Sequence, residues 1–353
     1  MSQQADPLWS QDELEVAFAA LVAAADRAFL SGDFTDWLAC FTPDIIYSER
    51  GNGISGWNRQ AHGLAEVRTW IEALRTQPYQ EHQLYRPVPW HIVDGPKAWV
   101  VCEWRNRLRD PGDGSVHEWR CYARLIYGGN GKWRFVEEIY NSTAQRMVMA
   151  AWRDARRAAE QAGLGIPEPD LHWGQGLSPA DEPPDRSWPR AEMIAAVEHF
   201  DAVCARAFLG HDHEEWVDCF TDDVVYKELA MQMDGSFLPV MRGKEAARHW
   251  INTVFNRFPI DSQTQFPIGW YVIDEARGWI VLEWRNQMED PGNGEHFEER
   301  SYTRLKYGGN GQFSMEEDIY DPNRMREMIV RWLEARRRAL GRDQTEQLLT
   351  LEN

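Results

Sequence analysis

Apolar residues at helical spacing open each half of the chain. Residues 12–30 carry apolar side chains three and four positions apart, and residues 192–209 repeat that pattern. This spacing places the apolar side chains on one face of a helix, which can then pack on a core. The pattern therefore predicts two long amphipathic helices, one near the start of each half.

Both halves continue with the same order of elements. A short helical segment and an apolar strand come next, and then a third helix, which the pattern predicts over 64–75 and 244–256. In the first half, strand-like segments then cover 83–94, 98–109, 116–127 and 132–140. A last helix closes each half, over 142–160 and 323–340. Helices first and an antiparallel meander afterwards predict the α+β fold class.

Whole motifs recur about 180 residues apart. The sequence Glu-Trp-Arg-Asn occurs at 103–106 and again at 283–286, and Tyr-Gly-Gly-Asn-Gly occurs at 127–131 and again at 307–311. Matches at several separate motifs indicate a duplicated domain. Six prolines between the copies indicate an extended connector. The predicted organisation is a first domain over 8–160, a Pro-rich linker over 161–190 and a second domain over 191–342.

The composition is that of a globular protein with an acidic surface. Hydrophobic residues make up 43% and charged residues 27%, which is enough for a substantial core. The net charge of −18 argues against nucleic acid and anionic membranes as partners, because both are bound through basic groups. No apolar stretch is long enough to span a membrane, and the N-terminus does not resemble a secretion signal. We therefore expect a cytoplasmic protein.

Cysteine and histidine spacing gives no sign of a metal site. The five cysteines are odd in number and lack the CxxC spacing of zinc sites or the pairing of a disulfide framework. A run of His and acidic residues at 211–214 is predicted to be a solvated helix entry instead. We expect no metal and no organic cofactor. The 18 tryptophans suit either a large core or an aromatic-lined pocket.

One motif after the second helix resembles a known superfamily. The pattern Phe-Thr-x-Asp, two apolar residues, then Tyr-x-Glu, occurs at 41–49 and at 220–228. With the order of elements, it resembles the nuclear transport factor 2-like superfamily, also called SnoaL-like. The resemblance implies a cone of curved sheet and helices around one deep apolar pocket, in each of two tandem domains. It also implies an internal pseudo-dimer, because family members often form homodimers, and it leaves a larger homo-oligomer open.

The resemblance also suggests residues that carry the chemistry. Aligned with the ketosteroid isomerase pattern, Glu49 and Glu228 fall where that enzyme has its proton-shuttling carboxylate. A partly desolvated carboxylate can take up and return a proton near neutral pH. Tyr47 and Tyr226 lie two residues earlier in the same strands and face the same side. The alternative is that both glutamates are rim carboxylates in solvent.

The last strand of each half adds a second set of polar groups. By the family pattern, the positions that face the pocket are Val136, Glu138 and Tyr140 in the first half, and Glu316, Asp318 and Tyr320 in the second. Each half would then offer at least two carboxylates and two phenols, which can divide into acid and base roles. A polar pocket mouth or a hydrogen-bonded strand end is the alternative. The isomerase's oxyanion-hole residues are not kept, because Ala123 and Thr303 replace its neutral aspartic acid.

Alternation along the strands separates pocket residues from surface residues. The more apolar face includes Trp104 and Asn106, with Trp284 and Asn286 in the second half, and is predicted to form the pocket wall. Trp90 and Trp270 are further substrate-contact candidates, with burial in the core as the alternative. The other face carries alternating charges and is predicted to form cross-strand ion pairs or an interface between the halves. Its members include Glu103, Arg105, Glu118, Arg120 and Arg124.

These residues favour a cofactor-independent lyase, dehydratase or isomerase that acts on a hydrophobic aromatic or polycyclic small molecule. The alternatives are a non-catalytic module that binds a hydrophobic ligand or a protein, and an epoxide hydrolase in which carboxylates and Asn106 or Asn286 position water. An acidic pocket rim would favour neutral or cationic ligands over carboxylates. The sequence does not select a substrate.

Overall fold

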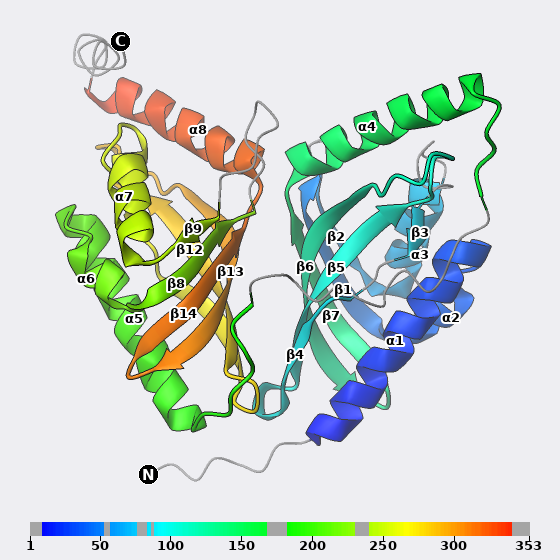
Figure 1. Ribbon diagram of the computed structural model, residues 1–353, viewed down its shortest axis with the longest axis horizontal. Helices are drawn as coiled ribbons and strands as arrows, with labels where there is room; N and C mark the ends of the chain where they lie inside the picture. Colours follow the sequence, from blue (N-terminus) through cyan, green and yellow to red (C-terminus); the bar gives the residue numbers. More distant parts are fainter. Residues whose placement is uncertain are drawn as a thin grey trace. The chain divides into compact units, whose positions relative to one another are not determined.

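The computed structural model describes residues 9–52, 57–75, 83–85, 88–167, 182–229 and 240–340. The chain forms two compact units, and the main division between them falls between Glu182 and Pro183. Each unit combines helices with one strongly curved sheet (Figure 1). The structure therefore confirms the predicted fold class of two tandem α+β domains.

The first unit has a seven-stranded sheet in the order β2-β1-β7-β6-β5-β3, with β4 paired to β5. Strands β1 and β7 run parallel and the other pairs are antiparallel. The meander is therefore joined to the strand that follows the short second helix. The elements are α1 (Gln11–Ser31), α2 (Thr35–Ala39), β1 (Phe41–Asn52), β2 (Trp57–His62), α3 (Gly63–Arg75), β3 (Gln83–Tyr85), β4 (His91–Asp94), β5 (Trp99–Leu108), β6 (Glu118–Gly129), β7 (Lys132–Tyr140) and α4 (Ser142–Gln161).

The second unit repeats this topology. Its sheet has the order β10-β12-β13-β14-β8-β9, with β11 paired to β12, and β14 runs parallel to β8. The elements are α5 (Arg190–Gly210), α6 (Glu214–Asp218), β8 (Phe220–Glu228), β9 (Met241–Arg242), α7 (Lys244–Phe255), β10 (Gln263–Gln265), β11 (Ile268–Asp274), β12 (Trp279–Met288), β13 (Glu298–Gly309), β14 (Gln312–Ile319) and α8 (Pro322–Leu340).

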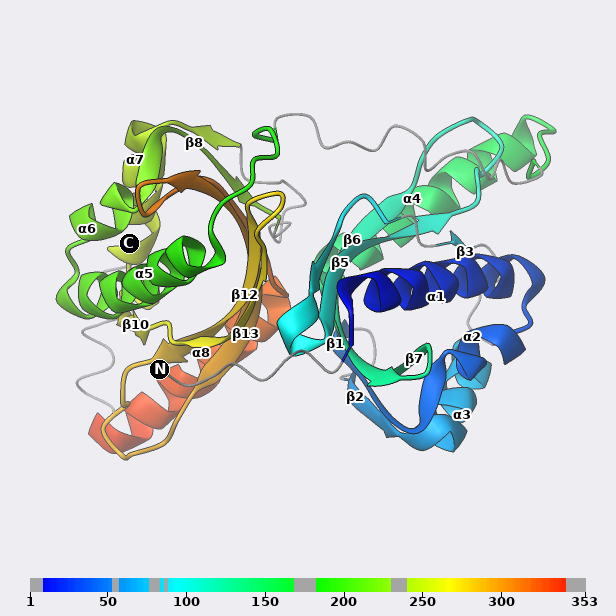
Figure 2. The same ribbon diagram turned by 90° about the horizontal axis from the view of Figure 1, so that it is seen from below.

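The long first helix of each unit lies inside the curve of its own sheet (Figure 2). In α1 the buried residues include Leu14, Phe18 and Leu21, which follow the helical spacing of the sequence. Ser10 caps this helix, since its hydroxyl accepts the backbone N–H of Glu13 at 3.1 Å. The helix thus presents one apolar stripe to the sheet, and the core of the unit lies between them.

A tryptophan before each long helix packs on the hairpin of its unit. Trp9 contacts Tyr127 edge-on with ring centroids 5.4 Å apart, and Trp188 contacts Tyr307 at 5.0 Å. The backbone N–H of Trp188 also donates to the carbonyl of Glu275 at 2.9 Å. Part of the predicted linker is therefore attached to the second unit. The limits 8–160, 161–190 and 191–342 stay a prediction, and residues 8, 168–181, 341 and 342 lie outside the described residues.

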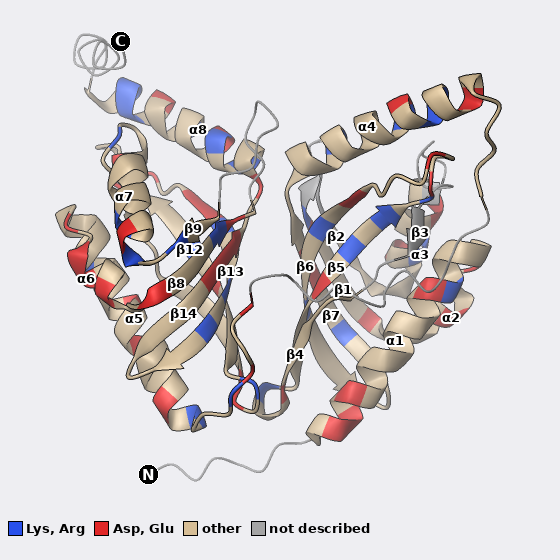
Figure 3. Cartoon of the chain, viewed as in Figure 1, with Lys and Arg blue, Asp and Glu red and all other residues tan. Residues whose placement is uncertain are grey.

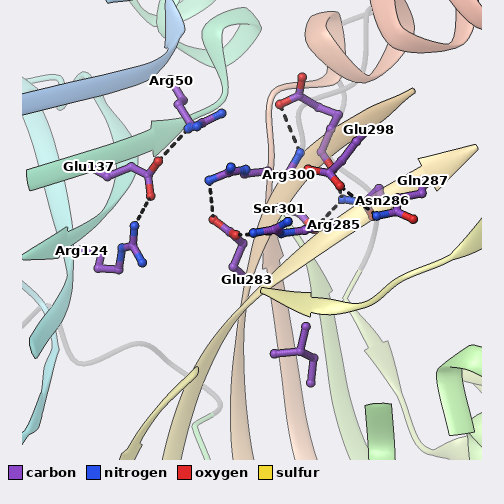
Figure 4. A network of polar contacts seen from close by, with 12 residues as sticks. Arg50, Arg124, Glu137, Glu283, Arg285, Asn286, Gln287, Glu298, Arg300 and Ser301 are labelled. Atoms are coloured by element: carbon purple, nitrogen blue, oxygen red, sulfur yellow. Dashed lines mark hydrogen bonds and ion pairs between the residues drawn. The ribbon is translucent and has the colours of Figure 1, made fainter. Parts of the chain in front are cut away.

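Oppositely charged residues lie close together on β5, β6 and β7 (Figure 3). Arg105 Nη1 lies 2.7 Å from Glu118 Oε1 across the β5–β6 pair. Glu137 receives both Arg50 at 2.7 Å and Arg124 at 2.9 Å, as Figure 4 shows. The predicted cross-strand ion pairs are present. In the second unit, Figure 4 likewise shows Glu283 beside Arg300 and Arg285.

Candidate active site

The candidate site of the second unit is built on two neighbouring parallel strands, β8 and β14. Their register places Tyr226 opposite Glu316 and Glu228 opposite Asp318. Residues two apart in a strand face the same side of the sheet, so all four side chains share one face. This face is the inner one, because all four residues line an internal cavity.

Hydroxyl groups donate to two of these carboxyl groups. The Tyr226 hydroxyl donates to Asp318 Oδ2 at 2.6 Å and lies 3.5 Å from Glu228 Oε1. Thr303, opposite Asp318 in the β13–β14 pair, donates from its hydroxyl to Asp318 Oδ1. Tyr320 donates to Glu228. Two tyrosines and one threonine therefore hold Asp318 and Glu228 in place.

The cavity has a volume of about 140 Å³. An engineered apolar cavity of about 150 Å³ is large enough to bind benzene, so this space suits a ligand with one ring. Aromatic and aliphatic side chains form most of the wall, and polar groups are gathered at β8, β12, β13 and β14. The lining residues are Cys204, Phe208, Trp216, Tyr226, Glu228, Trp250, Ile251, Val254, Phe255, Ile260, Gln263, Phe266, Trp284, Asn286, Ser301, Glu316, Asp318, Tyr320 and Met325.

Burial sets the protonation of the three carboxyl groups in this cavity. It raises the pKa of Glu228 well above its usual value, and the nearby charge of Asp318 adds to the effect. The pKa of Glu316 is raised well above its usual value by the same two causes. Burial raises the pKa of Asp318 only to about 6, because hydrogen bonds from Thr303 and Tyr226 stabilise its charged form. Asp318 is therefore the most acidic of the three, and the two glutamates keep their protons to higher pH.

Two carboxyl oxygens in the cavity lack a donor. Glu228 Oε2 and Glu316 Oε2 are buried and accept no hydrogen bond from the described residues. The side chains themselves are almost fully buried, with 7% and 3% of their residue surface exposed. A buried polar atom without a partner costs about 1–3 kcal/mol, so these oxygens are positions for a proton or for a ligand group.

The first unit repeats the paired phenols and carboxylates in a tighter setting. Tyr47 donates to Glu138 Oε1 at 2.8 Å, and Tyr140 donates to Glu49 Oε1 at 2.9 Å. Glu49 is only partly buried. The third carboxyl is missing, since Val136 stands where the second unit has Glu316. The space that described residues enclose beside Tyr47 and Glu138 is about 10 Å³, roughly the volume that one water needs.

The predicted pocket-wall residues lie on the inner face. Trp104 and Trp284 line the cavities of their units, and Asn286 lines that of the second. Asn106 is buried two residues beyond Trp104 in β5, on the same face of the strand. Asn286 Nδ2 donates to Ser301 Oγ at 3.1 Å and to the carbonyl of Glu299 at 3.0 Å.

Trp90 and Trp270 lie on the other face of the sheet, so their predicted contact with substrate is wrong. Trp90 Nε1 donates to Glu103 Oε2 at 2.8 Å, and its ring packs edge-on against Tyr122 at 4.8 Å. Trp270 packs against Tyr302 at the same distance. These partners alternate with the residues that line the cavities.

His213 also differs from the expectation of a solvated helix entry. It is 2% exposed, and its ring packs between Phe208 and Phe255 with centroids 5.1 and 6.2 Å away. His213 Nδ1 lies 3.2 Å from Asn252 Oδ1. The internal repeat could have predicted this burial, because Phe34 occupies the same place before the short helix of the first unit. A position that takes phenylalanine in one copy is expected to be buried in the other.

The described residues contain neither a cluster of metal ligands nor a helix suited to a membrane. No group of three or more His, Cys, Asp and Glu side chains is arranged to hold a metal ion there. Among the helices of the described chain, none is both long and apolar enough to cross a membrane.

No protein-family model and no curated protein matches the chain. Similar solved structures include an NTF2-like protein from Anabaena variabilis, at 14% identity over 38% of this chain and 93% of that chain, with a TM-score of 0.29. Another, from Burkholderia pseudomallei, is also NTF2-like, at 18% identity, 39% and 95% coverage and a TM-score of 0.30. A SnoaL-like protein from Jannaschia sp. CCS1 has 12% identity, 41% and 96% coverage and a TM-score of 0.31. These three neighbours are described as NTF2-like or SnoaL-like proteins.

Proposed function

We propose that the second unit is a cofactor-independent acid–base enzyme, a lyase, dehydratase or isomerase, acting on a hydrophobic molecule with one ring. The observation that carries this proposal is the split protonation of three buried carboxyl groups around one small aromatic cavity. Neighbouring carboxyl groups with separated pKa values supply an acid and a base in one site. The volume of about 140 Å³ supports a single ring instead of a polycyclic ligand.

In the proposed mechanism Asp318 is the base. Its carboxylate takes a proton from a carbon or hydroxyl of the substrate, while protonated Glu316 or Glu228 gives a proton to the leaving oxygen or the receiving carbon. Both glutamates share hydrogen bonds with Asp318. One proton passing back from Asp318 to the glutamate then restores the starting state, so no external acid, base or electron carrier is consumed.

This assignment reverses the role expected for Glu228. The sequence resemblance placed the base at Glu228, but its raised pKa suits a proton donor, and Asp318 has the lower pKa of the pair. An epoxide hydrolase is less well supported, because both contacts of Asn286 Nδ2 are already with the protein. The first unit keeps the equivalent Glu49, Tyr47, Glu138 and Tyr140, and we assign no separate reaction to it.

The test is a screen of single-ring alcohols, ketones, alkenes and amines for conversion by the full chain without added cofactor. For a compound that is converted, Asp318→Asn should lower the rate about 10²–10⁴-fold, the usual cost of removing a general base. Asp222→Asn is the matched control, because it removes the same charge from a fully exposed side chain of β8. Full activity of a folded Asp318→Asn variant would refute the assignment. Ligand binding without conversion across the panel would favour a binding module.

A further inference from the structure

The cavity of the second unit contains acids without a basic partner. Three carboxyl groups face it, and no Lys, Arg or His is among the described residues that line it. Elsewhere in the same unit, buried carboxylates do have such partners, as Glu283 has Arg300 at 3.2 Å. Among the described residues, none that lines the cavity supplies a positive group to balance this charge.

The donors present do not complete the hydrogen bonding of these acids. The hydroxyl groups of Tyr226 and Thr303 donate hydrogen bonds to Asp318. The hydroxyl group of Tyr320 donates to Glu228. Glu228 Oε2 and Glu316 Oε2 remain without a donor although both are buried. A ligand that brings several N–H donors would satisfy both oxygens, whereas a hydrocarbon would satisfy neither.

The wall next to the carboxyl groups is a continuous aromatic surface. Tyr226 and Trp250 lie with ring centroids 4.6 Å apart, Trp216 lies 6.0 Å from Tyr226, and Trp216 lies 6.5 Å from Trp250. All three residues line the cavity. Faces of Trp and Tyr attract cations, and the attraction grows when water is excluded.

We infer that the cavity of the second unit binds an organic monocation, a primary ammonium carried on a single ring, with its N–H groups directed at Glu228 and Glu316 and its ring against Trp216, Trp250 and Tyr226. This inference rests on the proposed function, for which it names the substrate class. The site should therefore bind a positively charged ligand more tightly than a neutral ligand of the same shape.

Binding of such a cation is coupled to proton release. Glu228 and Glu316 keep their protons to higher pH because they are buried close to Asp318. An ammonium in contact with them would favour the ionised form of one glutamate, while the other keeps the proton that the proposed mechanism transfers. The cation competes with protons, so its affinity increases with pH. The titratable groups that face the cavity come from three elements and the residue that follows β14: Cys204 of α5, Tyr226 and Glu228 of β8, Glu316 and Asp318 of β14, and Tyr320. The pKa values of Cys204, Tyr226 and Tyr320 are raised well above their usual values, so these groups stay neutral in this range.

The first experiment compares three ligands by calorimetry on the full chain. Benzylammonium, benzyl alcohol and benzoate have one ring each and differ in charge. At pH 7.5 we expect benzylammonium to bind about tenfold more tightly than benzyl alcohol, and benzoate not to bind. Affinity for benzylammonium should fall several-fold at pH 5.5, with proton release visible as a dependence of the heat on the buffer. Equal affinity for the amine and the alcohol would overturn the inference.

The repeat supplies the variant for the second experiment. Glu316→Val installs the residue that the first unit carries at position 136, a substitution that this fold already accommodates. It should remove the preference for benzylammonium and leave benzyl alcohol bound, while Asp222→Asn should change neither. Glu316→Gln, which keeps the shape, covers the case in which the valine variant does not fold. An unchanged preference in a folded Glu316 variant would also overturn the inference.

The proposed function can fail independently of this inference. Tight, pH-dependent binding of benzylammonium without conversion of any ring amine would support the inference and reject the enzyme. Conversion of neutral ring compounds that is blocked by Asp318→Asn and unaffected by benzylammonium would support the enzyme and reject the inference.

Discussion

Tyr226 and Asp318 are diagonal neighbours on two parallel strands, and the tyrosine hydroxyl donates to the carboxylate at 2.6 Å. The first unit has the same relationship between Tyr47 and Glu138, at 2.8 Å. In the second unit the bond stabilises the ionised form of Asp318, within a cluster whose other two carboxyl groups have pKa values well above the usual value. This single donor therefore affects which member of the cluster is the base.

Tyr226→Phe should raise the pKa of Asp318 above its value of about 6, because one donor to the charged form is lost. The rise in rate or ammonium affinity with pH should shift to higher pH by about one unit. A pH profile of either quantity measures the shift. Tyr307→Phe is the matched control, since that hydroxyl donates to Glu192 at 2.7 Å. An unshifted profile in Tyr226→Phe would contradict this account.

The buried carboxyl cluster should make the second unit less stable as the pH rises. A carboxyl whose folded pKa exceeds its unfolded value stabilises the fold at low pH, and the contribution is lost as the pH rises through the folded pKa. For Asp318 the window runs from 3.8 to about 6, a loss on the order of 2–3 kcal/mol. Glu316→Val should reduce the slope of unfolding free energy against pH between about 4.5 and 7. Denaturant titrations at several pH values measure it, and a slope unchanged by the variant would count against the cluster.

Over part of this pH range, His213 should make the second unit more stable as the pH rises, which is opposite to the effect of the carboxyl cluster. Burial lowers the pKa of His213 in the folded state, so stability is lost as the pH falls below about 6.5. His213→Phe, which copies Phe34 of the first unit, should remove that loss and raise the unfolding free energy by about 1 kcal/mol. His199→Phe on the exposed face of α5 is the control. A destabilised His213→Phe variant would show that the imidazole is required there.

The two faces of the second sheet should respond differently to loss of tryptophan. Trp284 lines the cavity and packs against Phe200 at 5.5 Å, whereas Trp270 packs against Tyr302 on the other face. Trp284→Leu should weaken binding of benzylammonium about tenfold. Trp270→Leu should leave that affinity unchanged, although it lowers stability. Calorimetry and thermal unfolding of both variants give the comparison, and equal losses of affinity would mean that the faces are assigned incorrectly.

Alternation within strands predicted the inner face well where a strand is long. Trp284 and Asn286 lie in a strand of ten residues and line the cavity. Glu316 and Asp318 on β14 line it as well, but the family pattern and not alternation suggested them. Trp90 stands just before the short strand β4, where no alternating neighbours define its direction. Its face is decided by the hydrogen bond to Glu103 and by the contact with Tyr122, both from other strands.

Pairing between distant strands was beyond the reach of local patterns. The sequence predicted an antiparallel meander, but hydrophobic spacing does not tell which strand joins its edge. The parallel pairing of β8 with β14 decides that Glu228 and Asp318 are neighbours. The protonation order was unpredictable for the same reason, because it depends on burial and on donors such as Thr303 that come from a third strand.

The pairing of β8 with β14 has a consequence for how the site comes into being. Tyr226 and Asp318 are 92 residues apart in the chain, and they meet only when the first and last strands of the unit join. Contacts between residues so far apart carry a large entropic cost of loop closure and form slowly. In a refolding experiment, the helices and the β12–β13–β14 meander should therefore acquire structure before any ligand is bound. During synthesis, the aromatic wall residues up to Trp284 are made before residue 318. Until β14 has been made and pairs with β8, the second unit cannot bring its proton donor and acceptor together in one cavity.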